Sequence, residues 1–510
     1  MGRRIRWAGV TILVCFALLI VQLVNVQFRR APALADSPYN PRVAAQRFDN
    51  VRGSITASDG TILAESVKTT QGPYHYTRAY PVGNVPGGNI YAGVTGYDSI
   101  FFGTSGIEYE YNSYLEAHPQ QARNLSQLIF DQPASAPDNV VLTIDPVLQQ
   151  AAWNALTTLP PGQNRDGAVV VLNPTTGAIL AMVSNPTFDT NAFASPNITA
   201  EQGADYADSI RDHEGYQPDN PIAIGSVFAP GSTFKVVTST AVYNLDPSLE
   251  NFSFKVAPFV KFPNGLPIYN DGGTPCGGTM ITMLPASCDP GYAALGAALG
   301  IKTLTQQAQL FGLNVCGPSD TNVPGIDLPH VQPSCISDVP PGPVNDALVG
   351  QTAIGQYDDA MTPLQNALVA SAIADGGVIM TPHLMAEITD PQGNVITTFE
   401  PTPMLRASSQ TAAAAVDDLM EGVATHGTAA GVGFPSSWQI SVKTGTAQFP
   451  GGKEEETQDW MIGFMPSRGT PQLAFAVVVP QQEQDLTGAL VAGPIVKAVV
   501  SAYVAEKGLP

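Results

Sequence analysis

Charged side chains are scarce in this chain, and lysine is especially rare. Only 13% of the 510 residues are Asp, Glu, Lys or Arg, nine are lysines, and the formal net charge at pH 7 is −20. A nucleic-acid-binding protein needs a basic face to neutralise phosphates, so this balance argues against a nucleic-acid partner. The hydrophobic share of 44% suits a globular protein, and the length suits two or three domains.

Cysteine and histidine are also few, which limits metal chemistry. The chain has five cysteines and six scattered histidines, without the combined spacing of a zinc site. We therefore expect no metal site and no cofactor, and we interpret the histidines as structural or surface residues. Cys15 lies in an apolar N-terminal run. The other four cysteines allow three disulfide pairings, and the set with short loops, Cys276–Cys288 with Cys316–Cys335, is our hypothesis.

Long apolar runs are almost absent, with one exception at the N-terminus. Residues 7–26 carry no formal charge, and about 20 residues is the length that a bilayer core requires. Three arginines precede the run, which favours a cytoplasmic N-terminus. We predict an uncleaved single-pass anchor with the bulk of the chain on the extracytoplasmic face, and no second run of spanning length. A cleavable signal peptide is the alternative, because residues 33–35 have the small-x-small form.

One serine and one of the rare lysines stand three residues apart. Ser232 and Lys235 form the only S-x-x-K sequence of the chain, and apolar residues continue the segment as a helical face. Residues i and i+3 share one face of a helix, so the Lys235 amine can lie beside the Ser232 hydroxyl. A buried lysine of lowered pKa could then accept the proton of a nucleophilic serine. The alternative is a solvated helix surface.

A second lysine motif follows far along the chain. Residues 443–446, Lys-Thr-Gly-Thr, contain the only K-T-G. The glycine lets a strand approach a substrate closely, and the lysine and hydroxyls supply hydrogen-bond donors. Together with Ser-x-x-Lys, this motif completes the parts of an acyl-transfer site. In the alternative, Lys443 only protects a strand edge against aggregation.

These two motifs resemble the active-site motifs of penicillin-binding proteins and the related serine β-lactamases. The family's third motif, S-x-N, is best matched by residues 287–289, Ser-Cys-Asp. Ser287 fits the family's proton-relay role, and a Cys276–Cys288 disulfide would brace this loop. The alternative is a plain loop beside a disulfide.

Asp289 departs from the family pattern, in which this residue is an asparagine. An ionised aspartate only accepts hydrogen bonds and cannot donate one to a substrate carbonyl. Asp289 could instead pair with Lys235 or Lys443. Such a pair would raise the lysine pKa and work against its use as a base.

A further set of motifs precedes the serine. Residues 52–64 resemble the R-G-x-I…G-x-x-L-A signature of the N-terminal pedestal of class B penicillin-binding proteins, and Asp59-Gly60 within it predicts a β-hairpin. Residues 78–81 and 106–112 match the same family. We interpret all three as parts of a module interface, with residues 31–41 as a linker.

The remaining pattern predicts an α+β protein. We expect helices at 146–156, 411–424 and 491–504, a hairpin of strands 168–172 and 178–183, and strands at 440–446, 459–465 and 473–479. Residues 187–220 are polar and are expected to form a loop. The resemblance implies an antiparallel sheet flanked by helices, with a helical lobe and a pedestal. We predict an anchor at 1–28, a pedestal at 29–139 and a transpeptidase domain at 140–510.

The resemblance also implies a function: a peptidoglycan D,D-transpeptidase that cross-links stem peptides through a Ser232 acyl-enzyme and is inhibited by β-lactams. It assigns catalysis to Ser232, Lys235, Ser287, Asp289 and Lys443. It assigns substrate binding to Lys443, Thr444, Gly445 and Thr446. The implied partner is a separate membrane glycosyltransferase. Within class B, the short chain, the absence of a C-terminal repeat and Asp289 resemble an actinobacterial subgroup.

Several alternatives follow from the same residues. A serine β-lactamase shares the two lysine motifs, but the anchor and pedestal are unneeded in a compact secreted enzyme. A catalytically weak envelope scaffold is favoured only by Asp289. A β-lactam sensor would need a cytoplasmic effector, and a bifunctional glycosyltransferase would need a longer N-terminal region.

Overall fold

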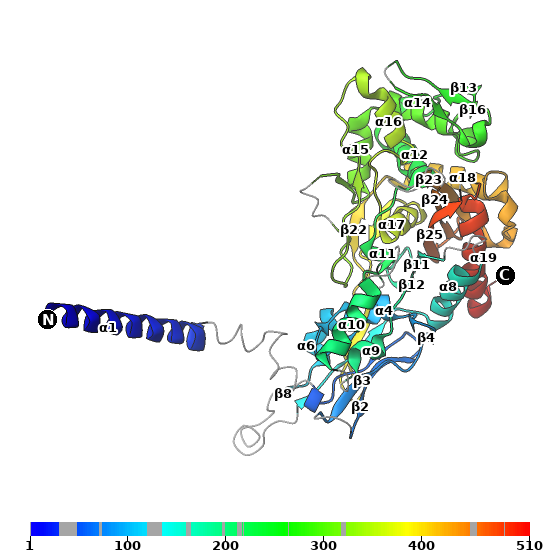
Figure 1. Cartoon of the computed structure of the whole chain (residues 1–510). Coiled ribbons are helices and arrows are strands. Elements are labelled where there is room, and N and C mark those ends of the chain that lie inside the picture. Colours follow the sequence, from blue (N-terminus) through cyan, green and yellow to red (C-terminus); the bar gives the residue numbers. More distant parts are fainter. Residues whose placement is uncertain are drawn as a thin grey trace.

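The computed structural model describes residues 2–29, 48–70, 74–119, 135–159, 165–195, 199–211, 217, 219–263, 265–317, 323–448, 456–483 and 485–509. The predicted linker and the small-x-small sequence lie outside these residues. Figure 1 shows a long body with blue strands at one end, a sheet in the middle and a green helical lobe at the other end. Helix α1 stands apart from this body.

Helix α1 (Gly2–Val24) and the π-helical turn Asn25–Arg29 that follows it contain the apolar run. The segment Gly9–Gln27 has a mean hydropathy of 2.5 with none of it buried, which makes it a candidate membrane span. The expectation of no second such run is wrong by length and composition, because α19 (Gly488–Lys507) also qualifies. Half of that helix is buried, and it packs against the central sheet and α8.

The central sheet is antiparallel and has the strand order β12-β11-β25-β24-β23. Helix α17 packs on one face, while α8 and α19 pack on the other. Because both faces are covered, the inner strand β11 is apolar and all six of its residues are buried. The bounds are β11 (Gly167–Leu172), β12 (Ile179–Asn185), β23 (Ser441–Gln448), β24 (Glu456–Met465), β25 (Leu473–Glu483), α8 (Pro146–Thr158) and α17 (Pro363–Ala374).

These elements confirm the predicted strands and helices and the α+β class. The expected cap at the start of α8 is present, since the Asp145 carboxylate accepts hydrogen bonds from the Val147 and Leu148 amides. The helical lobe follows the serine motif. It consists of α12 (Lys235–Leu245), α13 (Met280–Met283), α14 (Asp289–Leu299), α15 (Ile301–Leu310) and α16 (Asp346–Thr352), with small hairpins between them.

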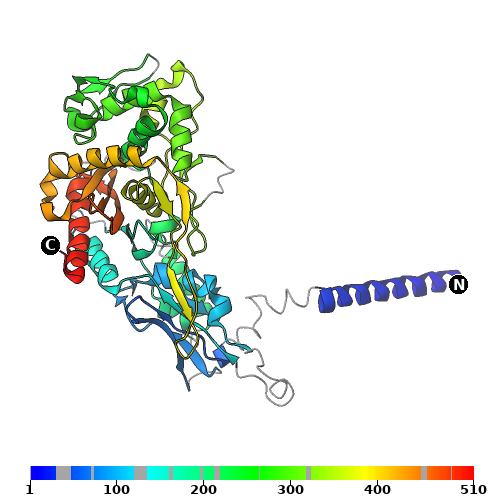
Figure 2. The ribbon, with the colours of Figure 1, turned by 180° about the vertical axis from the view of Figure 1, so that it is seen from behind.

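The pedestal is built on a six-stranded sheet with the order β21-β20-β10-β1-β2-β3. The predicted hairpin around Asp59-Gly60 is confirmed, because β1 and β2 pair antiparallel. Two strands come from far along the sequence and extend this sheet, as the yellow strands beside the blue ones in Figure 2 show. The bounds are β1 (Ile55–Thr56), β2 (Ile62–Lys68), β3 (Tyr76–Ala79), β10 (Asn139–Leu142), β20 (Met385–Thr389) and β21 (Val395–Thr398). The domain boundaries at 28 and 139 remain predictions.

The expected loop at 187–220 is wrong over much of its length, because it contains α9 (Thr190–Ala194) and α10 (Ala200–Arg211). These helices bury Phe193, Ala207 and Ile210 against Ala92 and aromatic rings of the pedestal. The apolar signal was present in the three-residue spacing of Ala207 and Ile210, but many polar neighbours obscured it.

The three pedestal motifs meet in one buried ion cluster. The Glu108 carboxylate accepts hydrogen bonds from Arg52 Nε and Arg78 Nε, each at 2.6 Å, and all three residues are at most 4% exposed. Arg52 also donates to Asn112 Oδ1 at 2.8 Å. Asp98, also buried, lies 3.6 Å from Arg52 Nε, so two carboxylates balance the two guanidinium groups that the fold has removed from water. The motifs are therefore explained by a shared buried charge network.

We expect Glu108→Gln to destabilise the pedestal by about 3–5 kcal/mol, because it leaves two buried guanidinium groups without their carboxylate. Urea unfolding followed by circular dichroism measures this change. Glu110→Gln is the matched control, since Glu110 lies on the same helix and is exposed. Equal stability of the two variants would contradict this prediction.

Candidate active site

The candidate nucleophile lies at the start of a buried helix. Ser232 is in a 3₁₀ turn, Gly231–Phe234, that runs directly into α12. This turn places the Lys235 ammonium 2.8 Å from the Ser232 hydroxyl oxygen. Lys235 is fully buried, which excludes the surface-lysine alternative, whereas Ser232 is 8% exposed.

Two residues of the third motif also contact the Lys235 amine. Lys235 Nζ donates to the Ser287 carbonyl at 2.7 Å and to the Asp289 carboxylate at 2.6 Å. The Ser232 hydroxyl lies 3.5 Å from the same carboxylate oxygen. Asp289 therefore lies within contact of both members of the candidate nucleophile–base pair.

Opposing effects act on the pKa of Lys235. Burial lowers this pKa by removing the ammonium from water, and the Asp289 carboxylate raises it by attraction. Burial dominates, so the net direction is downward. The expected Asp289–Lys235 pair therefore exists, but it does not raise the pKa of Lys235 above its ordinary value.

The second lysine comes from the neighbouring strand. Lys443, fully buried on β23, donates to Ser287 Oγ at 2.9 Å, and Lys235 Nζ lies 3.3 Å from the same oxygen. Burial and repulsion from Lys235 hold the pKa of Lys443 well below its ordinary value. Ser287 therefore connects the two amines through one hydroxyl, as a proton relay requires.

Strand β23 approaches the serine turn closely because it contains a glycine. A Cβ atom at Gly445 would lie only 2.9 Å from Thr233 Cγ2 and 3.0 Å from the Pro230 carbonyl oxygen. Strand β23 is also an edge strand, so its outer side faces no further strand of its sheet. The strand is thus placed to line the site with residues 443–446.

The sequence did not indicate several residues that contact these motifs. Thr428 shares a 2.6 Å hydrogen bond with the Thr444 hydroxyl, and Asn366 donates to Thr233 Oγ1 at 3.0 Å. Asp459 lies beside Thr446, and Asn270 lies beside Asp289. None belongs to a recognisable motif, and each reaches the site only through folding.

Asp459 is the missed residue with the clearest electrostatic effect. It lies on β24 opposite Thr446 and accepts a hydrogen bond from the Thr446 hydroxyl at 3.2 Å. The same hydroxyl accepts the Gly488 amide at 3.2 Å. Burial raises the pKa of Asp459 to about 7, opposed by hydrogen bonds from Thr446 and Thr457, and Asp271 adds a further increase.

Ionisation of Asp459 is expected to weaken reaction with carboxylate ligands as the pH rises through about 7. The charged form binds the Thr446 hydroxyl hydrogen strongly and repels a ligand carboxylate, whereas the neutral form below this pH is a weaker acceptor and has no charge to repel the ligand. Asp459→Asn should remove this falling limb from the pH profile of penicillin acylation. Stopped-flow acylation rates between pH 5 and 9 measure it.

The same substitution has an expected effect on stability. The raised pKa means that the folded protein binds its proton more tightly than the unfolded chain, so stability falls between about pH 4 and 7 and stays lower above. Asp459→Asn should therefore be more stable than the wild type at pH 8 but not at pH 4. Identical acylation and unfolding profiles for the two proteins would rule out the assigned titration.

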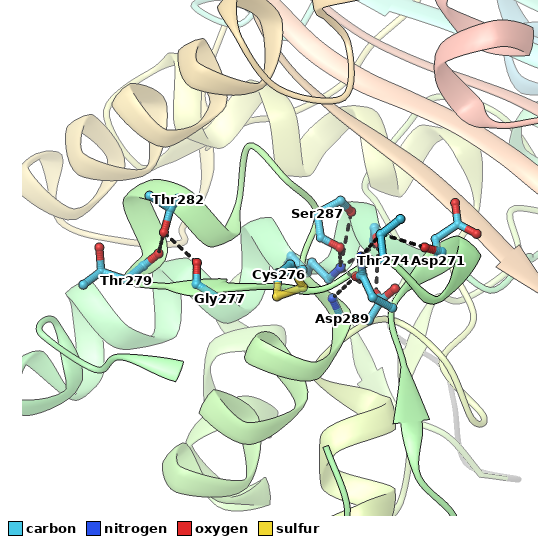
Figure 3. The surroundings of a disulfide bond; sticks show 12 residues. Asp271, Thr274, Cys276, Gly277, Thr279, Thr282, Ser287 and Asp289 are labelled. Atoms are coloured by element: carbon cyan, nitrogen blue, oxygen red, sulfur yellow. Dashed lines mark hydrogen bonds and ion pairs between the residues drawn. A yellow bond between two sulfur atoms is a disulfide. The ribbon is translucent and has the colours of Figure 1, made fainter. Parts of the chain in front are cut away.

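Both disulfide pairings of our hypothesis are present. Cys276 is bonded to Cys288 and Cys316 to Cys335. Cys288 is the middle residue of the third motif, and Figure 3 shows Ser287 and Asp289 close to the bridge. Ser287 has a φ of 51°, a left-handed conformation that is uncommon for a residue other than glycine. The bridge and this strained residue together fix the loop.

Comparison with known proteins defines the class. A model of the penicillin binding protein transpeptidase domain matches residues 167–501, and a model of the penicillin binding protein A dimerisation domain matches residues 52–136. The chain therefore belongs to the penicillin-binding protein transpeptidase family, with the class B arrangement of a dimerisation domain before a transpeptidase domain. The predicted family and fold are confirmed.

Individual members of this family are similar to nearly the whole chain. Peptidoglycan D,D-transpeptidase PbpA of Mycolicibacterium smegmatis is 35% identical over 520 residues, which cover 99% of this chain and 100% of that protein. PbpA of Mycobacterium tuberculosis is 33% identical over 516 residues, with 98% and 99% covered. The structure of penicillin-binding protein A from M. tuberculosis as a ceftriaxone acyl-enzyme has a TM-score of 0.78 at 32% identity, covering 90% of this chain and 99% of that chain. The expected similarity to actinobacterial penicillin-binding protein A is confirmed.

Proposed function

We propose that this protein is a peptidoglycan D,D-transpeptidase that acts through a Ser232 acyl-enzyme and is inhibited by β-lactams. The observation that carries the proposal is the buried Lys235 amine 2.8 Å from the Ser232 hydroxyl oxygen. The PbpA relatives are named as enzymes of this activity, and the related M. tuberculosis protein was solved as acyl-enzymes with β-lactams.

Acylation starts from neutral Lys235. Its amine accepts the Ser232 proton while the serine oxygen attacks the penultimate D-Ala carbonyl of a stem peptide. The backbone N–H groups of Ser232 and Thr446 stabilise the oxyanion, and such donors are worth roughly 2.7–4 kcal/mol each in other acyl-transfer enzymes. The tetrahedral intermediate then collapses. The bond to the terminal D-Ala breaks, and the departing amine takes the proton from Lys235.

Deacylation repeats these steps with a second stem peptide. Its amine attacks the Ser232 ester and gives a proton to Lys235, which returns the proton to the serine oxygen as the new amide forms. Ser287 relays protons between the amines. Lys443 and Thr444 bind the substrate carboxylate, and Lys443 also donates a hydrogen bond to the Ser287 hydroxyl of the relay.

The cellular arrangement is also a proposal. Helix α1 anchors the chain with its N-terminus in the cytoplasm, and the catalytic domain lies on the extracytoplasmic face, where peptidoglycan is found. The arginines before the apolar run support this orientation. Neither matched family model is a glycosyltransferase domain, so we propose a separate membrane glycosyltransferase as the partner that supplies glycan strands.

Intact-mass spectrometry of the protein with penicillin G tests this function. We expect a covalent adduct of one penicillin, located on Ser232 by peptide mapping, that persists for minutes or longer. Release of hydrolysed penicillin within seconds would support a serine β-lactamase. A complete absence of adduct at high penicillin concentration would support the non-catalytic scaffold.

A further inference from the structure

Asn270 is a buried polar residue outside all three catalytic motifs. It follows the short strand β15 (Ile268–Tyr269) and precedes the turn Asp271–Gly273. Only 8% of it is exposed. Burial of a carboxamide is unfavourable unless its donors and acceptor are paired, so its partners indicate what it does.

Both ends of the Asn270 carboxamide are hydrogen-bonded. The oxygen Oδ1 accepts the backbone N–H of Asp289 at 3.0 Å, and the nitrogen Nδ2 donates to Thr274 Oγ1 at 2.9 Å. Thr274 in turn donates to the Asp271 carbonyl at 3.0 Å. The backbone N–H of Asn270 also donates to the Pro258 carbonyl at 2.9 Å. The side chain is therefore held in one orientation from both sides.

The accepted N–H belongs to the first turn of α14, where backbone amides have no partner within the helix. Cys288, the cap residue, supplies no side-chain hydrogen bond. Asn270 supplies the missing acceptor from the segment after β15, 19 residues before Asp289 in the sequence. In Figure 3, Thr274 and Asp271 lie next to Asp289 and complete this arrangement.

We propose that Asn270 is a positioning residue of the transpeptidase reaction, which holds Asp289 at the distance where its carboxylate contacts both Lys235 and Ser232. The proposal rests on the proposed function of that site. Asp289 is bound to Lys235 at 2.6 Å, and a displacement of about 1 Å in a catalytic group can lower a rate by roughly 100-fold.

Loss of the Asn270 bond has a specific electrostatic consequence. The charged groups that face Lys235 are Asp289 on α14, Lys443 on β23 and Asp271 in the turn after β15. Withdrawal of the Asp289 carboxylate removes the attraction that stabilises the ammonium, so the pKa of Lys235 falls further. Acylation needs the neutral amine, so the acylation rate rises with pH as Lys235 loses its proton. This rise, the acidic limb of the pH profile, therefore moves to lower pH when the pKa falls.

The experiment measures penicillin acylation of Asn270→Leu between pH 5 and 9. We expect the second-order rate at its optimum to fall roughly 10- to 100-fold and the acidic limb to shift to lower pH. Asn270→Asp keeps an acceptor for the Asp289 amide and should recover part of the rate, with its acidic limb at higher pH than that of Asn270→Leu because the added carboxylate attracts the ammonium. Asn154→Leu is the control, because Asn154 is an exposed asparagine on α8.

A double-mutant cycle with Asp289→Ala separates positioning from a general loss of folding. If Asn270 acts through Asp289, Asn270→Leu adds little to Asp289→Ala, and both share the shifted limb. Additive rate losses with an unshifted limb would overturn the proposal, as would wild-type behaviour of Asn270→Leu. The failure of the wild type itself to form an adduct would instead contradict the proposed function.

Discussion

Ser232→Ala is expected to abolish covalent labelling by penicillin, because alanine has no oxygen to form the ester. Without the nucleophile, Lys235 and the oxyanion donors cannot produce an acyl-enzyme, whatever binding affinity remains. The measurement is gel labelling with a fluorescent penicillin, together with intact mass. The substitution removes one oxygen atom from a mostly buried position and preserves the helix, so the variant should remain folded.

Ser248→Ala provides the matched control, since Ser248 is an exposed serine just after the same helix. It should label like the wild type. An undiminished adduct on Ser232→Ala would show that another residue is the nucleophile, and peptide mapping would then locate it.

Lys235→Met is expected to lower the acylation rate by about 10²- to 10⁴-fold, the usual contribution of a general base. Methionine retains much of the lysine stem in a fully buried position but cannot accept a proton. The acidic limb of the pH profile should disappear as well, because the group that must lose its proton is gone. Stopped-flow acylation at several pH values gives both results.

Lys302→Met serves as the control, because Lys302 is an exposed lysine on α15. Its rate should match the wild type. If Lys235→Met kept its rate and its acidic limb, Lys443 would be the better candidate for the base, since its pKa is also lowered and it contacts Ser287.

The sequence predicted most of the central sheet, because its strands carry a strong local signal. Strand β11 is a continuous apolar run, and α8 begins at an aspartate followed by a proline. Such elements are defined by their own residues. The prediction failed at α10, where the apolar face is short and the surrounding composition is polar.

Contacts between elements that lie far apart in the sequence could not be predicted from local sequence patterns. Strands β20 and β21 join the pedestal sheet although they follow the helical lobe in the sequence, because β20 pairs with β10 across more than two hundred residues. Asn270 and Asp459 show the same limit within the site. Each is an ordinary polar residue in the sequence, and its role depends on a partner brought from another element.

The sequence by itself determined that Ser232 and Lys235 meet, because a spacing of three residues along one continuous helical segment brings their side chains together. It also determined the apolar N-terminal segment through its length and lack of charge. The tertiary structure alone decided the protonation chemistry. The pKa values of Lys235, Lys443 and Asp459 depend on burial and on charges from separate elements, and only folding removes water and sets those distances.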